Sequence, residues 1–264
     1  MRVGVTLPQF RDDAEAAIAV ARRAEAAGLD GVFVFDHMWP LGRPDRPALQ
    51  STVLLGALAA ETERVTLGTL VARVGMVPDA VLVHQLVTLA RIAGPGLRGP
   101  NAVNSRFVAT VGTGDRKNQP ENAAYGVPFG SVQERVAALI TVVRGLRAAG
   151  VTTWVGGTSR AIVRAATEAD GWNGWGISAA RLAQYAAEFT ALGAPAEITW
   201  AGQVLFGEAS DARPEVVAGT VAGIARHLEA VAATGATWAI CAPIDIGARP
   251  EAVELLAEAA EAVR

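Results

Sequence analysis

Short apolar runs alternate with alanine-rich stretches along the whole chain. Residues 32–35 read Val-Phe-Val-Phe with no polar residue between them, which is typical of a strand buried on both faces of a sheet. Similar runs recur along the chain, each bounded by glycine, proline or polar residues. We therefore predict strands at residues 3–7, 32–35, 65–71, 107–111, 153–155, 171–177, 198–206 and 238–242.

Helices are predicted between these strands. Residues 14–27 are rich in alanine with scattered charges, and Gly28 follows them as a C-terminal cap. The other stretches have the same character. The helices are predicted at residues 14–27, 49–62, 78–92, 131–146, 160–169, 179–192, 216–233 and 251–263.

A regular alternation of eight strands with eight helices predicts an α/β protein with a (β/α)₈ TIM barrel as a single domain over residues 1–264. The alternative is a doubly wound open sheet. That fold favours a G-x-G-x-x-G turn after the first strand, whereas this chain has Pro8-Gln9-Phe10 there. The barrel is therefore the preferred interpretation.

Three connections between the predicted elements stand out. Residues 94–105 form a long turn-rich insert before the fourth strand, and residues 116–130 form a polar loop after it. The connection from Leu146 to Thr152, between the fourth helix and the fifth strand, is in contrast very short.

Composition narrows the class of protein. A net charge of −3 argues against a nucleic-acid or membrane-surface partner, and 51% apolar residues are enough for a large core. The single cysteine, Cys241, lies in an apolar run and is interpreted as a core residue. Neither a signal peptide nor a membrane-spanning run is recognised, so we expect a cytoplasmic protein.

Asp36 and His37 end the strand at residues 32–35. An acid and an imidazole are costly to desolvate, and the carboxyl ends of parallel strands are where active sites are built. Histidine exchanges protons near neutral pH, which suits a general acid or base. These two residues are therefore predicted to mark the active site of an enzyme.

Other common catalytic patterns are missing from the sequence. The three histidines are far apart, without an H-x-H or H-E-x-x-H pattern, so no metal site is predicted. No G-x-S-x-G segment occurs, and a serine hydrolase therefore lacks support.

The order of the motifs resembles the luciferase-like monooxygenase superfamily, in particular its branch that uses the deazaflavin coenzyme F420. The resemblance covers nearly the whole chain. It rests on the order and spacing of VGVTLPQF (3–10), GLDGVFVFDHMWP (28–40), RVTLGTLV (64–71), GTGD (112–115), AYGVPFGSVQER (124–135), WVGGTS (154–159) and EADGWNGW (168–175).

This resemblance implies roles for residues at the ends of the second and third strands. His37 is expected to give or take a proton during hydride transfer, and Asp36 to orient the imidazole or to bond the F420 ring. Leu70 and Val71 are expected to be joined by a non-proline cis peptide behind the ring. Arg73, just beyond, is expected either to meet a phosphate or to be solvated.

The resemblance also implies roles for residues at the ends of later strands. Gly112 and Gly114 let the backbone approach a ligand, and Asp115 stands where relatives usually have a catalytic glutamate. Asn118 is expected to bond the cofactor. A helix follows Gly156, Gly157 and Thr158, and this turn is expected to hold the cofactor's tail or phosphate.

Tryptophans near the strand ends have two open interpretations. Trp39 and Trp172 are predicted to line the substrate pocket, with packing in the core as the alternative. Trp175 has the same ambiguity. Family members usually carry a long insert between the fourth helix and the fifth strand, so its shortness here implies a more open site or one completed by a partner subunit.

The sequence thus favours an F420-dependent oxidoreductase that transfers a hydride between F420 and a small organic substrate. The alternatives are an FMN-dependent luciferase-like monooxygenase and a non-catalytic flavin or deazaflavin carrier. The resemblance further implies a homodimer, and a reductase for F420 or flavin as the supplier of electrons.

Overall fold

A closed barrel of parallel strands forms the centre of the protein. The computed structural model describes residues 1–94, 105–194, 197–208, 213 and 215–264. The strands are β1 (Arg2–Thr6), β2 (Gly31–Val34), β3 (Thr66–Thr69), β4 (Ala72–Arg73), β5 (Phe107–Gly112), β6 (Thr152–Gly156), β7 (Gly171–Trp175), β8 (Glu197–Phe206), β9 (Val217–Gly219) and β10 (Trp238–Pro243).

The strands pair in the order β1-β2-β3-β5-β6-β7-β8-β10, and β10 returns to β1. Every pairing is parallel, and the register that closes the ring places Trp238 opposite Arg2 on one side and opposite Thr199 on the other. β4 continues the third strand beside β5, and β9 adds to the edge of β8. The predicted (β/α)₈ barrel is therefore confirmed.

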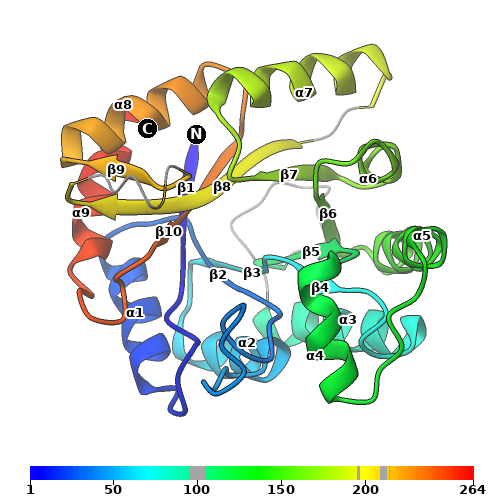
Figure 1. Ribbon diagram of the computed structural model, residues 1–264. Helices are drawn as coiled ribbons and strands as arrows, with labels where there is room; N and C mark the ends of the chain where they lie inside the picture. Colours follow the sequence, from blue (N-terminus) through cyan, green and yellow to red (C-terminus); the bar gives the residue numbers. More distant parts are fainter. Residues whose placement is uncertain (95–104, 195–196, 209–212, 214) are drawn as a thin grey trace.

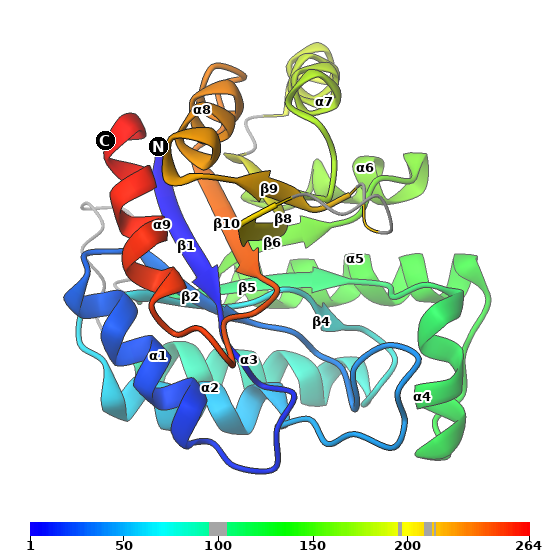
Figure 2. The same cartoon turned by 60° about the vertical axis from the view of Figure 1, so that its left-hand side comes forward.

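Helices surround the barrel on its outside (Figures 1 and 2). The two ends of the chain lie together, and the Met1 amino group donates to the Val263 carbonyl at 2.6 Å. The helices are α1 (Glu15–Ala26), α2 (Ser51–Glu61), α3 (Asp79–Ala93), α4 (Gln119–Ala124), α5 (Val132–Ala148), α6 (Arg160–Ala166), α7 (Ala179–Ala191), α8 (Val221–Ala232) and α9 (Ala252–Ala260), with 3₁₀ turns η1 (Arg116–Asn118) and η2 (Glu261–Val263).

Aromatic side chains fill the barrel interior. Phe33, Trp154 and Trp238 come from β2, β6 and β10, and their ring centroids are 5.7 to 6.3 Å apart. All three are fully buried. Glycines on neighbouring strands leave room for them: a Cβ at Gly4 would lie 2.8 Å from the Phe33 ring. The interior is a packed core, so a ligand site can form only at its rim.

The structure differs from the prediction in two places. Residues 216–220 were predicted as the start of a helix, but residues 217–219 form β9, and the helix begins at Val221 after the capping Thr220. The polar loop at residues 116–130 contains η1 and α4, because Asp115 and Asn118 form a capping box that starts a helical turn.

Of the long insert and the short connection, the structure describes only the short connection in full. The insert at residues 94–105 lies, apart from Gly94 and Ser105, outside the described residues. The short connection is confirmed, since only residues 149–151 separate α5 from β6.

Candidate active site

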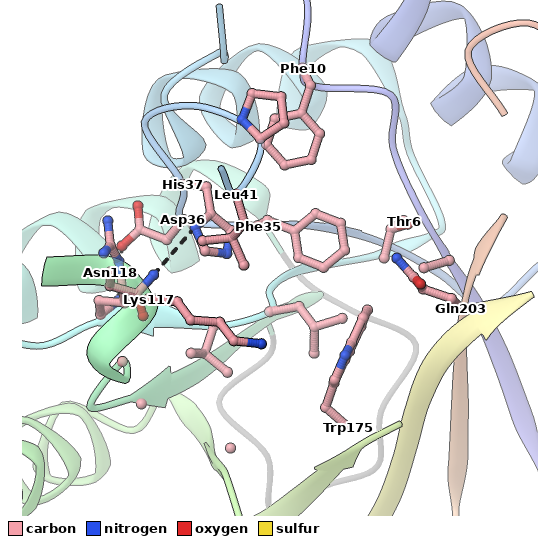
Figure 3. Close-up of a pocket in the computed structure, with 18 of the residues that line it drawn as sticks. Thr6, Phe10, Phe35, Asp36, His37, Leu41, Lys117, Asn118, Trp175 and Gln203 are labelled. Carbon is pink, nitrogen blue, oxygen red and sulfur yellow. Dashed lines mark hydrogen bonds between the residues drawn. The ribbon is translucent and has the colours of Figure 1, made fainter. Parts of the chain in front are cut away.

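A large cavity opens at the carboxyl ends of the barrel strands (Figure 3). Its volume is about 940 Å³, which is at the upper end of the range for small-molecule and cofactor sites. Its wall includes almost every residue predicted for the site: Asp36, His37, Leu70, Val71, Gly112, Gly114, Asp115, Asn118, Gly156, Gly157 and Thr158.

His37 lies on the cavity wall beside a buried carboxylate. Its Nδ1 is 3.2 Å from Glu121 Oε1 and 3.4 Å from Asn118 Nδ2, and Figure 3 shows the approach of Asn118. Glu121 is fully buried and also accepts from the Met38 amide at 3.0 Å and from Asn118 Nδ2 at 3.1 Å. The carboxylate thus holds both the backbone and the ring at the end of β2.

The charge of Glu121 is stabilised by its neighbours. Burial raises the pKa of Glu121, but the hydrogen bond with His37, the charge of Arg73 and the hydrogen bond from Asn118 outweigh burial and lower this pKa to about 2. Arg73 Nη1 lies 2.8 Å from Glu121 Oε2. An ionised Glu121 can only accept a hydrogen bond, so in this contact His37 Nδ1–H is the donor, which leaves Nε2 as the basic nitrogen of the neutral ring.

Arg73 is not solvated, because it is buried beside Glu121. It is 4% exposed, and its backbone amide donates to Asp36 Oδ2 at 2.8 Å. The expectation of a solvated Arg73 is therefore wrong, whereas contact with a phosphate stays a prediction, since Arg73 also lines the cavity. The close opposite charge offsets part of the cost of burying each of the two groups.

Asp36 connects three elements at the rim. Its Oδ2 accepts from Arg73 N, and its Oδ1 accepts from Ser51 Oγ at 2.9 Å at the start of α2. Both carboxylate oxygens thus have protein donors. Asp36 fixes β4 against β2, while Glu121 rather than Asp36 contacts the imidazole.

The peptide between Leu70 and Val71 is cis, as predicted. The Val71 side chain packs against the ends of β5 and β6, where a Cβ at Gly112 would lie 2.6 Å from Val71 Cγ2 and one at Gly156 would lie 2.5 Å from Val71 Cγ1. These two glycines therefore make room for Val71, and the predicted reason for them, close approach of a ligand to the backbone, is incomplete.

Asp115 is an exposed capping residue. Its Oδ1 accepts from the Lys117 amide at 2.8 Å, and its own amide donates to Asn118 Oδ1 at 2.8 Å. Gly114 has φ +62, and a Cβ there would lie 2.9 Å from Asn118 Oδ1. The turn thereby presents Asn118 to His37, and its acid caps η1.

Of the tryptophans near the strand ends, one packs in the core, one lies away from the cavity and one lines it. Trp172 is fully buried against Tyr185 and Phe189, with centroid distances of 4.7 and 5.6 Å, so its predicted place in the substrate pocket was wrong. Its Nε1 donates to the Gly157 carbonyl at 2.7 Å and supports that turn from behind.

Trp39 is also absent from the cavity wall, since it stacks on Tyr125 with centroids 6.2 Å apart. Trp175 lines the cavity instead and meets Phe35 edge to face at 5.5 Å. Figure 3 shows Trp175 on the side of the cavity away from Asn118. An aromatic wall of this kind suits a flat ring.

The sequence patterns do not single out Glu121 as a site residue. The available signal was the spacing Asn118-x-x-Glu121 beside Pro120 at a helix start. That signal predicts the short helix, but it does not predict burial of the carboxylate.

Metal sites and membrane spans are both absent from the described part of the chain. It contains no group of three or more His, Cys, Asp and Glu side chains placed to hold a metal ion. Within the same residues, no helix combines the length and apolar character needed to cross a bilayer.

Comparison with known proteins identifies a family. Residues 1–239 match the model of the luciferase-like monooxygenase family. An F420-dependent glucose-6-phosphate dehydrogenase of Kineococcus radiotolerans is 36% identical over 125 residues, a match that covers 47% of this chain and 33% of the relative. The chain thus matches about a third of the length of that curated relative.

Solved structures share the fold. An F420-dependent secondary alcohol dehydrogenase in complex with an F420–acetone adduct superposes with a TM-score of 0.77 at 15% identity, covering 100% of this chain and 99% of that one. The oxygenating constituent of a Baeyer–Villiger 3,6-diketocamphane monooxygenase of Pseudomonas putida, in complex with FMN, gives 0.70 at 11% identity, covering 100% and 99%. F420 and FMN are thus both bound by proteins that share this barrel fold.

Proposed function

Because the chain belongs to the luciferase-like monooxygenase family, we propose that it is an F420-dependent oxidoreductase that transfers a hydride between F420 and a small organic substrate. The observation that carries this proposal is the position of His37 between the cavity and the buried Glu121. The 36% identical relative is named as an F420-dependent dehydrogenase, which favours F420 over FMN.

The cavity fits a tricyclic cofactor. Its volume of about 940 Å³ accommodates a ring and part of a tail, and Phe35, Val71 and Trp175 provide apolar wall. When bound, F420 supplies the hydride acceptor or donor. We propose that Leu70 and Val71 support the ring, that Gly112, Gly114 and Asn118 border it, and that Gly156, Gly157 and Thr158 hold the tail.

The proposed role of His37 is to move the proton that accompanies the hydride. In the oxidising direction, Nε2 takes the hydroxyl proton of the substrate while the adjacent C–H bond gives up its hydride. The imidazolium that forms is stabilised by Glu121, which keeps its charge at neutral pH. Asp36 acts through the backbone of β4 as a positioning residue, and Asp115 as the cap that presents Asn118.

Three further parts of the proposal come from the family resemblance. They are a homodimer, an F420 reductase as the source of reduced cofactor, and a cytoplasmic location.

Titration of the purified protein with F420 and with FMN, followed by fluorescence, tests the cofactor. Tighter binding of F420 is the expected result. Tighter binding of FMN would replace the proposal by an FMN-dependent monooxygenase.

Substitution of the imidazole tests the mechanism. His37→Ala is expected to retain F420 affinity within about threefold and to lower kcat by about 10²-fold or more, since general acid–base catalysis contributes about that much. His84→Ala is the matched control, because His84 is exposed on α3 outside the barrel. Equal turnover in both variants would remove His37 from the mechanism, and F420 binding without turnover of any alcohol would indicate a carrier.

A further inference from the structure

Lys117 is the only lysine of the chain, among 23 basic residues. It is exposed on η1 and lines the cavity. Figure 3 shows its side chain extending into the cavity towards the wall that contains Trp175. Its amino group has no hydrogen-bond or ion-pair partner among the described residues, so it presents a free positive charge to a ligand.

The cavity wall has an excess of positive charge in a chain whose net charge is negative. Both lining carboxylates are already used by the protein, since Asp36 accepts from Arg73 N and Ser51 Oγ, and Asp115 accepts from Lys117 N. A ligand with a negative group is therefore favoured over a neutral one. The charged lining residues are Arg11, Asp36, Arg46, Arg73, Asp115, Lys117 and Arg213. Arg73 is paired with Glu121 and Arg11 with Asp13, so the excess comes from Arg46, Lys117 and Arg213.

We propose that Lys117 binds an anionic group of the substrate, a phosphate or a carboxylate, and thereby selects charged substrates. Lys117 precedes Asn118, which contacts both His37 and Glu121, so it stands at the end of the cavity where the proton moves. The turn proposed for the cofactor's tail, at residues 156–158, lies on β6 instead. The assignment to the substrate rests on the proposed function.

A single lysine makes a direct binding test possible. Reductive methylation with ¹³C-formaldehyde labels Lys117 and the Met1 amino group and keeps their positive charge. In NMR titrations without cofactor, glucose 6-phosphate and inorganic phosphate are expected to shift the Lys117 resonance saturably. Glucose is expected to leave it unchanged. The Met1 resonance is the internal control, since that amine bonds Val263 O at the opposite end of the barrel from the strand ends.

Three variants complete the test. Lys117→Gln is expected to weaken binding of glucose 6-phosphate about tenfold or more, since a charge-assisted hydrogen bond is lost, and Lys117→Arg to retain most of it. Arg116→Gln removes the same charge from the neighbouring residue, which does not line the cavity, and is expected to change binding less than twofold. F420 affinity is expected to be equal in all three variants.

Two results would overturn the proposal. One is a Lys117 resonance that responds to neither phosphate compound up to about 20 mM. The other is a loss of F420 affinity in Lys117→Gln, which would assign the lysine to the cofactor. Failure of F420 to bind the unmodified protein would contradict the proposed function alone, because the phosphate titration contains no cofactor.

Discussion

Glu121 is the residue on which the geometry around His37 depends. It accepts hydrogen bonds from a ring, an amide side chain and a backbone amide, and it pairs with Arg73. Removal of a carboxylate from such a network leaves a buried arginine without its counter-charge, which is the costly way to break a buried pair.

Glu121→Gln is expected to lower the free energy of unfolding at pH 7 by roughly 3 kcal/mol. Because folding lowers the pKa of Glu121 from 4.5 to about 2, its stabilisation is present above pH 4.5 and is lost as the pH falls towards 2. The difference from the unmodified protein in urea unfolding should therefore shrink between pH 7 and pH 3.

Glu188→Gln, on the exposed face of α7, is the control. It should change the free energy of unfolding by no more than about 0.5 kcal/mol at pH 7 or at pH 3. A constant difference across this pH range would show that the carboxylate charge does not contribute to stability.

At the scale of elements, Arg106 joins two helices to the barrel. It is 5% exposed and donates to the carbonyls of Ala59 and Thr62 at the end of α2, of Val65 before β3, and of Ala93 at the end of α3. Helix C-termini leave carbonyls without intrahelical donors, and a buried end needs such partners. One guanidinium therefore supplies hydrogen-bond donors to the free carbonyls at both helix ends.

Arg106→Met is expected to lower the free energy of unfolding by roughly 3 kcal/mol, because several buried carbonyls lose their donor. Arg91→Met is the matched control, since Arg91 is exposed on α3. Chemical denaturation measures both. Equal stability of the two variants would contradict the role assigned to Arg106.

At the scale of the molecule, the barrel can close because large aromatic rings in its interior lie opposite glycines, which have no side chain. Phe33 occupies the space that side chains at Gly4, Gly31 and Gly68 would take. The strands that supply these residues, β1, β2 and β3, are consecutive in the ring, so this part of the core is shared by three strands. Overfilling one position therefore strains several strands.

Gly68→Ala is expected to destabilise the protein by about 1–3 kcal/mol, because its Cβ would overlap the Phe33 ring. Gly56→Ala, in α2 with nothing within 4 Å of a new Cβ, is expected to stabilise it by about 0.5–1 kcal/mol. Thermal unfolding measures whether the two substitutions change the stability in these opposite directions. A second change, Phe33→Leu, should recover part of the loss in Gly68→Ala.

The sequence by itself determined the order of strands and helices and the residues that stand at the strand ends. Continuous apolar runs and helix caps are local signals, so β2, its terminal Asp36-His37 pair and the barrel could be predicted from them. The cis peptide at Leu70–Val71 was predicted from family resemblance rather than from local signals.

Only the tertiary structure decided which side chains meet. Glu121 contacts His37 across 84 positions, Trp172 lies behind the Gly157 turn, and Lys117 faces a cavity formed by distant loops. Burial and charge pairing are properties of all surrounding elements together. A carboxylate in a polar loop has the same local sequence whether it is solvated or enclosed, and closure of the barrel decides between the two.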